Sequence, residues 1–165
     1  MESVIIFVCL VGVIALIINL KNKPEKQKLY KYYAKKQIMT NREADFFVKL
    51  NTIFNERFFV IPQVHLSAML DERVKGQNWR SAFRHINGKS VDYVLISRTS
   101  LELICAIELD DNTHDRPERS ARDKEVERIF EQAKIPLTRF RDIRGISNSK
   151  IISEISVAID QARTQ

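Results

Sequence analysis

Three carboxylates stand within or directly after two apolar runs of the sequence. Asp92 lies in the run Val91–Ile96, while Glu108 and Asp110 lie at the end of the run Leu101–Leu109. Both runs are rich in Val, Ile and Leu, and a polar turn separates them, which is typical of a hairpin of two strands buried on both faces. Carboxylates that meet in such a place repel one another unless a cation or a shared proton offsets their charge. We therefore predict that these three acids are ligands of a divalent ion, Mg²⁺ or Mn²⁺, which they hold through their carboxylate oxygens.

The register of the hairpin decides how closely the acids meet. A hairpin folded about Ser100 puts Asp92 opposite Glu108, whereas one folded about Thr99 puts Asp92 opposite Ala106, with Glu108 on the diagonal. Side chains alternate along a strand, so the two acids of the second run share one face. The alternative interpretation is that each acid is simply a solvated strand end.

A helix is expected just before these strands. Thr40 and Glu43 have the spacing of a capping box, in which each side chain satisfies a backbone N–H at the helix start. Glu43 is therefore a capping residue, a fourth acid directed at the metal, or both. The apolar residues after it recur at helical spacing, namely Phe46, Phe47, Leu50, Ile53 and Phe54.

The sequence pattern of the rest of the body predicts alternating helices and strands. Pro62 limits its strand to an edge of the sheet or to the strand's end, because proline cannot donate a ladder hydrogen bond. In chain order the pattern predicts a strand over Phe58–Val64, a short helix or turn over His65–Arg73, an irregular segment Lys75–Lys89, a helix Glu118–Lys134, a strand Leu137–Phe140, and a last helix capped by Ser147 or Ser149.

Two basic segments could contact phosphate groups. In Lys75–Lys89 aromatic and arginine side chains alternate, which suits stacking on bases, although such aromatics more often cover the flank of a sheet, and we favour cover. One face of the helix Glu118–Lys134 carries Arg and Lys, including Lys124, which could hold phosphates or form an ordinary salt-bridged, solvated face. The candidate nucleic-acid contacts are Trp79, Arg84, Arg119 and Arg122.

The first twenty residues form a separate appendage. The run Val4–Ile18 is apolar apart from Gly12, and four lysines follow it between residues 21 and 28. A secretory signal peptide would need a basic start and a cleavage site, and a buried core helix would not be apolar all round. We therefore predict a single-pass transmembrane anchor over residues 3–20, a basic linker over 21–39 and a body over 40–165, with the body in the cytoplasm by the positive-inside rule.

Charge and cysteine content narrow the class of partner. The 165-residue chain has a net charge of +6, and Glu2 is the only charged residue among the first twenty, so residues 21–165 carry +7. This favours a phosphate-bearing or anionic-lipid partner. Cys9 and Cys105 are the only cysteines, so neither a disulfide partner nor a zinc set is predicted.

The order of elements and three segments resemble a known family. The segments are VDYVL, AIELDDNTHDRPER and IPLTRF, and they resemble the bacterial family catalogued as domain of unknown function 2726. That family is similar to the very-short-patch repair endonucleases within the PD-(D/E)xK superfamily. The resemblance covers Thr40–Phe140. It implies an α/β fold with a restriction-endonuclease-like core, in which α-β-β-β-α-β elements build a central mixed sheet flanked by helices.

The resemblance also implies roles for individual residues. Asp92 and Glu108 match the metal-binding acids, Glu43 matches the acid that many members carry on the first helix, and His114 matches a loop histidine that serves the hydrolytic water or the leaving group. Asp110 stands where the superfamily usually has a lysine. It is then a further metal ligand, or the work of the lysine has moved to His114 or to Lys124.

The expected function is that of a metal-dependent nuclease-like protein at the bacterial inner membrane, which hydrolyses phosphodiester bonds of nucleic acid, with DNA as the expected substrate. The alternative is an inactive module of nuclease fold that binds nucleic acid or a partner protein at the membrane. A structural α/β domain with solvated acids is the third interpretation.

Overall fold

The computed structural model describes residues 1, 6–7, 10–14, 16, 30–110 and 117–164, with the backbone alone for 117–123. The chain divides into two compact units, Met1–Lys36 and Gln37–Gln165. In the first unit residues 6–7, 10–14 and 16 are helical. No helix among the described residues has the length and apolar character needed to cross a membrane. The remaining residues of the predicted anchor 3–20, and residues 21–29 of the predicted linker 21–39, lie outside the described residues.

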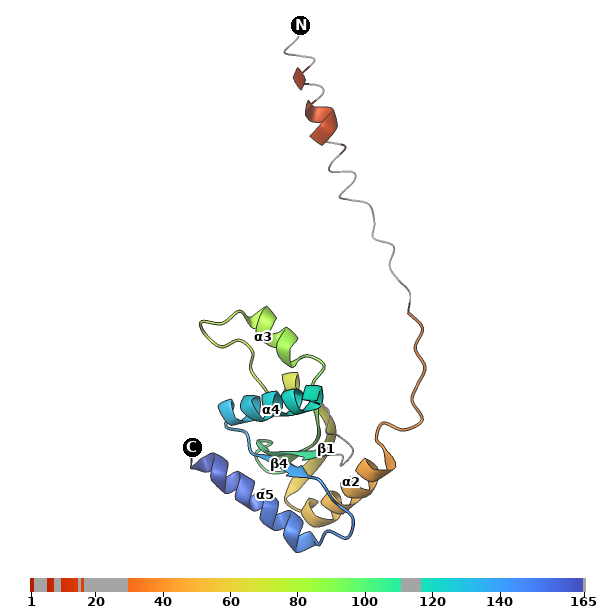
Figure 1. The fold of residues 1–165 in the computed structure, drawn as a ribbon, viewed down its shortest axis with the longest axis vertical. Helices are drawn as coiled ribbons and strands as arrows, with labels where there is room; N and C mark the ends of the chain where they lie inside the picture. The colour runs from red at the N-terminus through yellow and green to blue at the C-terminus, as the bar shows by residue number, and fades with distance from the viewer. Residues whose placement is uncertain (2–5, 8–9, 15, 17–29, 111–116, 165) are drawn as a thin grey trace. The chain divides into compact units, whose positions relative to one another are not determined.

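The second unit is a mixed α/β domain (Figure 1). Its order agrees with the sequence pattern except for one additional helix before the hairpin. The elements are α2 (Asn41–Phe54), β1 (Phe58–His65), η1 (Leu66–Ala68), α3 (Trp79–Ile86), β2 (Ser90–Ser97), β3 (Leu103–Leu109), α4 (Pro117–Gln132), β4 (Leu137–Phe140) and α5 (Asn148–Arg163).

The strands form one four-stranded sheet in the order β1-β2-β3-β4. The pairs β1–β2 and β2–β3 are antiparallel, whereas β3–β4 is parallel, so the sheet is mixed as predicted. In the central hairpin Tyr93 pairs with Ile107 and Val94 with Ala106. The same register, continued by one residue, sets Asp92 opposite Glu108, which is the pairing expected from a hairpin folded about Ser100. Nearer the turn the register shifts between Leu95 and Ile96, so that Ile96 pairs with Leu103.

Helices cover both faces of the sheet, with α2 and α5 on one side and α4 on the other (Figure 1). On the α2 side Phe46 is 1% exposed and packs its ring against Tyr93 of β2 and Phe140 of β4, with ring centroids 5.9 and 5.2 Å apart. On the other side Val126 and Phe130 of α4 pack on the sheet. The two central strands are thus covered on both faces, because their near-continuous apolar sequence needs burial on both.

The start of α2 confirms the predicted capping box. Thr40 accepts a hydrogen bond from the backbone N–H of Glu43, and the Glu43 carboxylate accepts one from the backbone N–H of Thr40. These contacts satisfy two donors that the first helical turn leaves without partners. They also fix the direction of the Glu43 side chain relative to the strands that follow.

The expectation of an irregular segment over Lys75–Lys89 is wrong. Residues Trp79–Ile86 form α3. Asn78 caps its start, because the Asn78 side chain accepts a hydrogen bond from the backbone N–H of Ser81. Only Ile86 of this helix is buried, and it joins the core beneath α4. The helix was missed because a single apolar anchor gives no helical stripe that periodicity can detect.

Candidate functional site

Asp92 lies half-buried at the end of the central hairpin. Its Oδ2 accepts a hydrogen bond of 2.7 Å from the backbone N–H of Leu109, which ties the carboxylate to the last residue of β3. Burial raises the pKa of Asp92 above its ordinary value, and the charges of Glu43 and Asp110 raise it further against the opposing N–H of Leu109 and the guanidinium of Arg42. Three acids therefore gather within electrostatic reach of one another.

Arg139 is the cation that offsets most of this charge. In the parallel pair β3–β4 it stands opposite Glu108, and the two side chains form an ion pair of 2.8 Å. The same guanidinium contacts Asp110 at 2.8 Å and Glu127 of α4 at 3.1 Å. The side chains of Glu108 and Arg139 are only 15% and 16% exposed, so these contacts are little screened by water. A single arginine therefore joins acids from β3, from the strand's end and from α4.

Arg42 holds the first turn of α2 against the same strand ends. Its guanidinium donates hydrogen bonds of 2.7 Å to the backbone carbonyls of Asp110 and Arg141. The Tyr93 hydroxyl donates to the backbone carbonyl of Glu43 at 2.6 Å. These contacts link a helix and two strands at one edge of the sheet. They explain how the carboxylate of Glu43, besides capping α2, comes near Asp92.

Gln63 of β1 supports Glu43 from the other side. The amide of Gln63 donates a hydrogen bond of 3.1 Å to the Glu43 carboxylate. The backbone of Gln63 has a φ of 53°, a left-handed conformation that costs a non-glycine residue about 1–3 kcal/mol. Strained residues of this kind are concentrated at binding and catalytic sites, which adds weight to this edge of the sheet.

The acids suit a hard divalent ion by their chemistry, because Mg²⁺ and Mn²⁺ prefer carboxylate oxygens. The arrangement of these acids in the structure is less suited to binding a divalent ion. Within residues 30–110 and 124–164, no three His, Cys, Asp or Glu side chains are set to hold a metal ion together. Glu108 and Asp110 are already paired with Arg139. An ion bound by Asp92, Glu108 and Asp110 would therefore have to displace this guanidinium.

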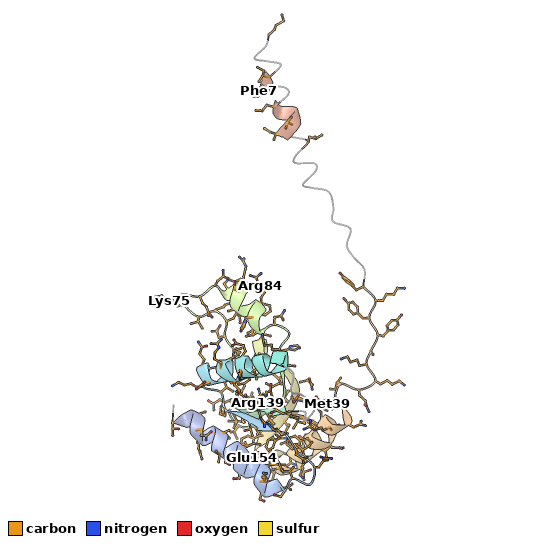
Figure 2. All side chains as sticks on the ribbon, in the orientation of Figure 1. Phe7, Met39, Lys75, Arg84, Arg139 and Glu154 are labelled. Carbon is orange, nitrogen blue, oxygen red and sulfur yellow. The ribbon has the colours of Figure 1, made fainter. Side chains whose placement is uncertain are left out.

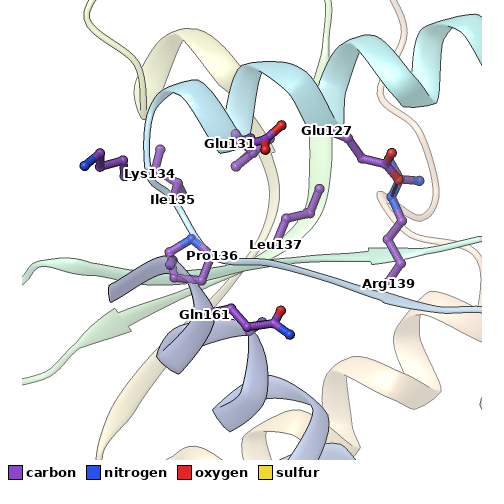
Figure 3. Close-up of a pocket in the computed structure, with 11 residues that line it drawn as sticks. Glu127, Glu131, Lys134, Ile135, Pro136, Leu137, Arg139 and Gln161 are labelled. Carbon is purple, nitrogen blue, oxygen red and sulfur yellow. Dashed lines mark ion pairs between the residues drawn. The ribbon is translucent and has the colours of Figure 1, made fainter. Parts of the chain in front are cut away.

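A cavity of about 390 Å³ begins at this ion-pair cluster and follows the outer edge of β4 (Figure 3). Glu127 and Arg139 lie at one end of it, and Lys134, Ile135 and Pro136 lie at the other. Residues of α5 close the opposite side, among them Gln161. The cavity therefore reaches the ion-pair cluster at Arg139 and Glu127, which are the two residues of the cluster that line it.

The other candidate residues lie away from this cluster or outside the described side chains. His114 belongs to residues 111–116, which the structure does not describe, and the side chains of Arg119 and Arg122 are also outside the description. Lys124 is exposed on α4. Trp79 and Arg84 lie on α3, where Arg84 is drawn on the far side of α4 from Arg139 (Figure 2).

The expectation that the aromatic residues of this segment cover the sheet is wrong for Trp79, which is 42% exposed, and for Phe83, which is 36% exposed. Their rings lie at the surface of α3. The salt-bridged interpretation of α4 is confirmed for Arg128, which pairs with Glu125 at 2.7 Å.

Sequence reasoning missed the two arginines that offset the charge of the acids, and it also missed the acid Glu127. Arg139 was placed only within the strand Leu137–Phe140, and neither Arg42 nor Glu127 was singled out. One signal was present, because Arg139 is the only charged residue in the apolar strand Leu137–Phe140 and shares a face with Leu137. The parallel pairing that sets it opposite Glu108 could not be read from the strand itself.

Comparison with known proteins identifies the family of this chain only. The family model described as "Protein of unknown function (DUF2726)" matches residues 35–159. No curated protein and no solved structure matches the chain.

Proposed function

The chain belongs to the DUF2726 family, a family of unknown function, and from the geometry of its own site we propose that it is a metal-dependent nuclease-like protein. It would hydrolyse phosphodiester bonds of nucleic acid, with DNA as the expected substrate. The observation that carries the proposal is the gathering of Glu43, Asp92, Glu108 and Asp110 at one edge of a buried mixed sheet. A restriction-endonuclease-like core is part of this proposal, because the helix-flanked mixed sheet agrees with it.

Asp92 and Glu108 are the proposed ligands of a Mg²⁺ or Mn²⁺ ion, completed by Asp110 or Glu43. The ion, when bound, supplies an acidified water molecule and shields the charge that develops on the phosphorus. The half-buried carboxylate of Asp92 carries an energetic cost while it is ionised without a cation, as its raised pKa indicates. A bound cation would remove that cost.

Arg139 has a defined part in this proposal. Its ion pairs neutralise Glu108 and Asp110, and it would have to leave these acids if they held an ion. Arg139 also lines the cavity beside β4, where its guanidinium could hold a phosphate oxygen. His114 is the proposed group that moves a proton to or from the reacting water or leaving group, since imidazole titrates near neutral pH.

Separate replacement of Asp92 by Asn and Glu108 by Gln tests this function. Both changes keep the size of the side chain and remove one charge. We expect each to lower the rate of Mg²⁺-dependent DNA cleavage by at least about 100-fold, the scale on which a positioned catalytic group contributes. Asp142→Asn, at an exposed acid outside the cluster, is the matched control and should leave cleavage unchanged. Equal cleavage by all three variants would refute the assignment.

A second function is supported by one specific observation. Arg139 already pairs with Glu108 and Asp110, so these two acids need no metal ion to offset their charge. The domain could then bind nucleic acid or a partner protein without turnover. A chelator distinguishes the two functions. A binding module still binds its partner when the chelator is present, whereas an enzyme no longer cleaves nucleic acid.

Attachment to the bacterial inner membrane through residues 3–20 remains part of the proposal, with the body in the cytoplasm. Extraction of membrane fractions at alkaline pH tests it. An integral anchor leaves the chain in the membrane pellet, whereas a peripheral protein is released. Removal of residues 1–36 should transfer the chain to the soluble fraction.

A further inference from the structure

The helix α3 carries an exposed aromatic side chain enclosed by arginines. Trp79 is 42% exposed, and the guanidinium carbons of Arg80 and Arg73 lie 5.1 and 5.5 Å from the centre of its ring. Phe83, four residues further along the helix and 36% exposed, lies on the same face. The two rings therefore form a short aromatic strip at the surface, and the guanidinium groups of Arg73 and Arg80 lie over the ring of Trp79.

Basic residues predominate around this strip, although Glu72 contacts Arg73 at 3.9 Å and Glu125 of α4 contacts His85 at 2.7 Å. From residue 73 to residue 89 the sequence contains five Lys or Arg and no Asp or Glu. A cavity of about 400 Å³ adjoins the ring of Trp79 and is lined by Arg73, Lys75 and Gly76 among others. We call this set the α3 surface, and it consists of Arg73, Lys75, Trp79, Arg80, Phe83 and Arg84.

We propose that the α3 surface binds single-stranded nucleic acid, with unpaired bases stacked on Trp79 and Phe83 and phosphates held by the basic side chains. The face of a base is available to an aromatic ring only when the base is not stacked within a duplex. The guanidinium groups beside Trp79 add cation–π and phosphate contacts. This inference rests on the proposed function, because it names the form of nucleic acid that reaches the acid cluster.

The position of α3 connects this surface with the acid cluster. His85 of α3 contacts Glu125 of α4 at 2.7 Å, and Glu127, two residues further on, contacts Arg139 at 3.1 Å. Glu125 and Glu127 are two positions apart on α4, so these two contacts lie on different sides of that helix. A strand stacked on Trp79 could therefore cross α4 and present a phosphate at the edge of the sheet.

The fluorescence of Trp79 tests the proposal directly, since it is the only tryptophan of the chain. The full chain in a non-ionic detergent, with a chelator present to prevent cleavage, is titrated with oligothymidylate of roughly a dozen nucleotides, a length that suits a single-strand site. We expect saturable quenching of Trp79 by the single strand. A duplex of the same length should bind at least about tenfold more weakly, because its bases cannot stack on the ring.

Variants separate stacking from general attraction. Measured by anisotropy of a labelled oligonucleotide, Trp79→Leu should weaken binding by roughly tenfold, the value of one base stacked on an aromatic ring. Arg80→Gln should lower the slope of log affinity against log salt by about 0.7. Phe59→Leu is the matched control, because Phe59 is 37% exposed and lies 4.2 Å beneath Arg98, away from α3. It should bind as wild type does.

Any of five outcomes would overturn the inference. They are stronger binding of the duplex, binding without a change in Trp79 fluorescence, normal binding by Trp79→Leu, an equal loss in Phe59→Leu and Trp79→Leu, and a fluorescence change with phosphatidylserine vesicles but none with oligonucleotide. The last would identify the α3 surface as a contact with anionic lipid.

Asp92→Asn should bind the single strand normally in the chelator. If that variant still cleaves DNA with Mg²⁺, the proposed function fails while the α3 inference stands, and if Trp79→Leu binds normally, the α3 inference fails alone.

Discussion

Glu108 and Arg139 stand opposite each other across the only parallel strand pair of the sheet that the structure describes, and their side chains are joined at 2.8 Å. Asp110 and Glu127 contact the same guanidinium. This relationship places a cation where the acids of the central hairpin would otherwise repel one another. Whether the cluster serves as a metal site or as a fixed ion-pair network is the question that the following predictions address.

Replacement of Arg139 by Ala should strongly destabilise the domain. Removal of one partner from a largely buried ion pair leaves its carboxylates without compensation, at a cost of about 3–5 kcal/mol in the free energy of unfolding. Urea unfolding measures the change. Arg141→Ala is the matched control, because Arg141 contacts the same Asp110 at 3.6 Å but its side chain is 81% exposed. The control should change stability by less than about 1 kcal/mol, and equal effects of the two changes would contradict the account.

The two halves of this cluster were unequally predictable from sequence. Asp92 and Glu108 come together through a hairpin, whose register follows from side-chain alternation and a short polar turn. Arg139 comes from a strand separated from the hairpin by the helix α4, and its pairing with Glu108 depends on how far β4 slides along β3. No local pattern determines that slide, so the acids were predictable and their cation was not.

The same contrast holds for the helices. The start of α2 was predictable because Thr40 and Glu43 satisfy each other's backbone within one turn. The helix α3 depends on the Asn78 cap and on a single buried residue, Ile86, which is fixed by tertiary contacts. The exposure of Trp79 could not be predicted, because sequence patterns assign large aromatic side chains to the core.

Asp92→Asn should raise the melting temperature at neutral pH. Burial raises the pKa of Asp92, so the native state binds its proton more tightly than the unfolded state does. The free energy of unfolding therefore falls as the pH rises from the ordinary aspartate pKa of about 3.9 through the raised pKa of native Asp92. Above this pH range the charged side chain destabilises the fold. Asparagine keeps the acceptor for the N–H of Leu109 and removes the charge.

Thermal unfolding of Asp92→Asn and wild type across this pH range is the measurement. The difference in melting temperature should shrink toward acid pH. Asp142→Asn is the control with the opposite sign, because hydrogen bonds from the backbone N–H and side chain of Arg144 hold the pKa of Asp142 below its usual value. A lower melting temperature for Asp92→Asn at neutral pH would show that the carboxylate is compensated in the fold.

Glu43→Gln should separate the capping role of Glu43 from its role in the acid cluster. Glutamine can still accept from the backbone N–H of Thr40 and complete the capping box, so the free energy of unfolding should change little. Thr40→Ala, which removes the cap, should cost about 1 kcal/mol. If Glu43 takes part in the proposed reaction, Glu43→Gln loses DNA cleavage and Thr40→Ala keeps it. Loss of cleavage in Thr40→Ala alone would make Glu43 a capping residue only.

Cys105 should be inert in the native state. Burial raises the pKa of its thiol to about 11, and the residue is 0% exposed. In a Cys9→Ser background, a thiol reagent at about pH 8, below the raised pKa, should modify Cys105 only through unfolding. The rate should then be slower than in denaturant by about a thousandfold or more, the ratio expected for a marginally stable domain. Rapid labelling of the native protein would contradict the packing of Cys105 between the sheet and α5.

The most direct test of the central claim is calorimetric titration of Mn²⁺ into the wild-type chain and Asp92→Ala, each alone and with a non-cleavable single-stranded oligonucleotide. The account predicts saturable binding near one ion per chain in the wild type, and its loss in Asp92→Ala under both conditions. No binding to the folded wild type under either condition, or equal binding by the two proteins, would contradict it. The cluster around Arg139 would then be a structural ion-pair network.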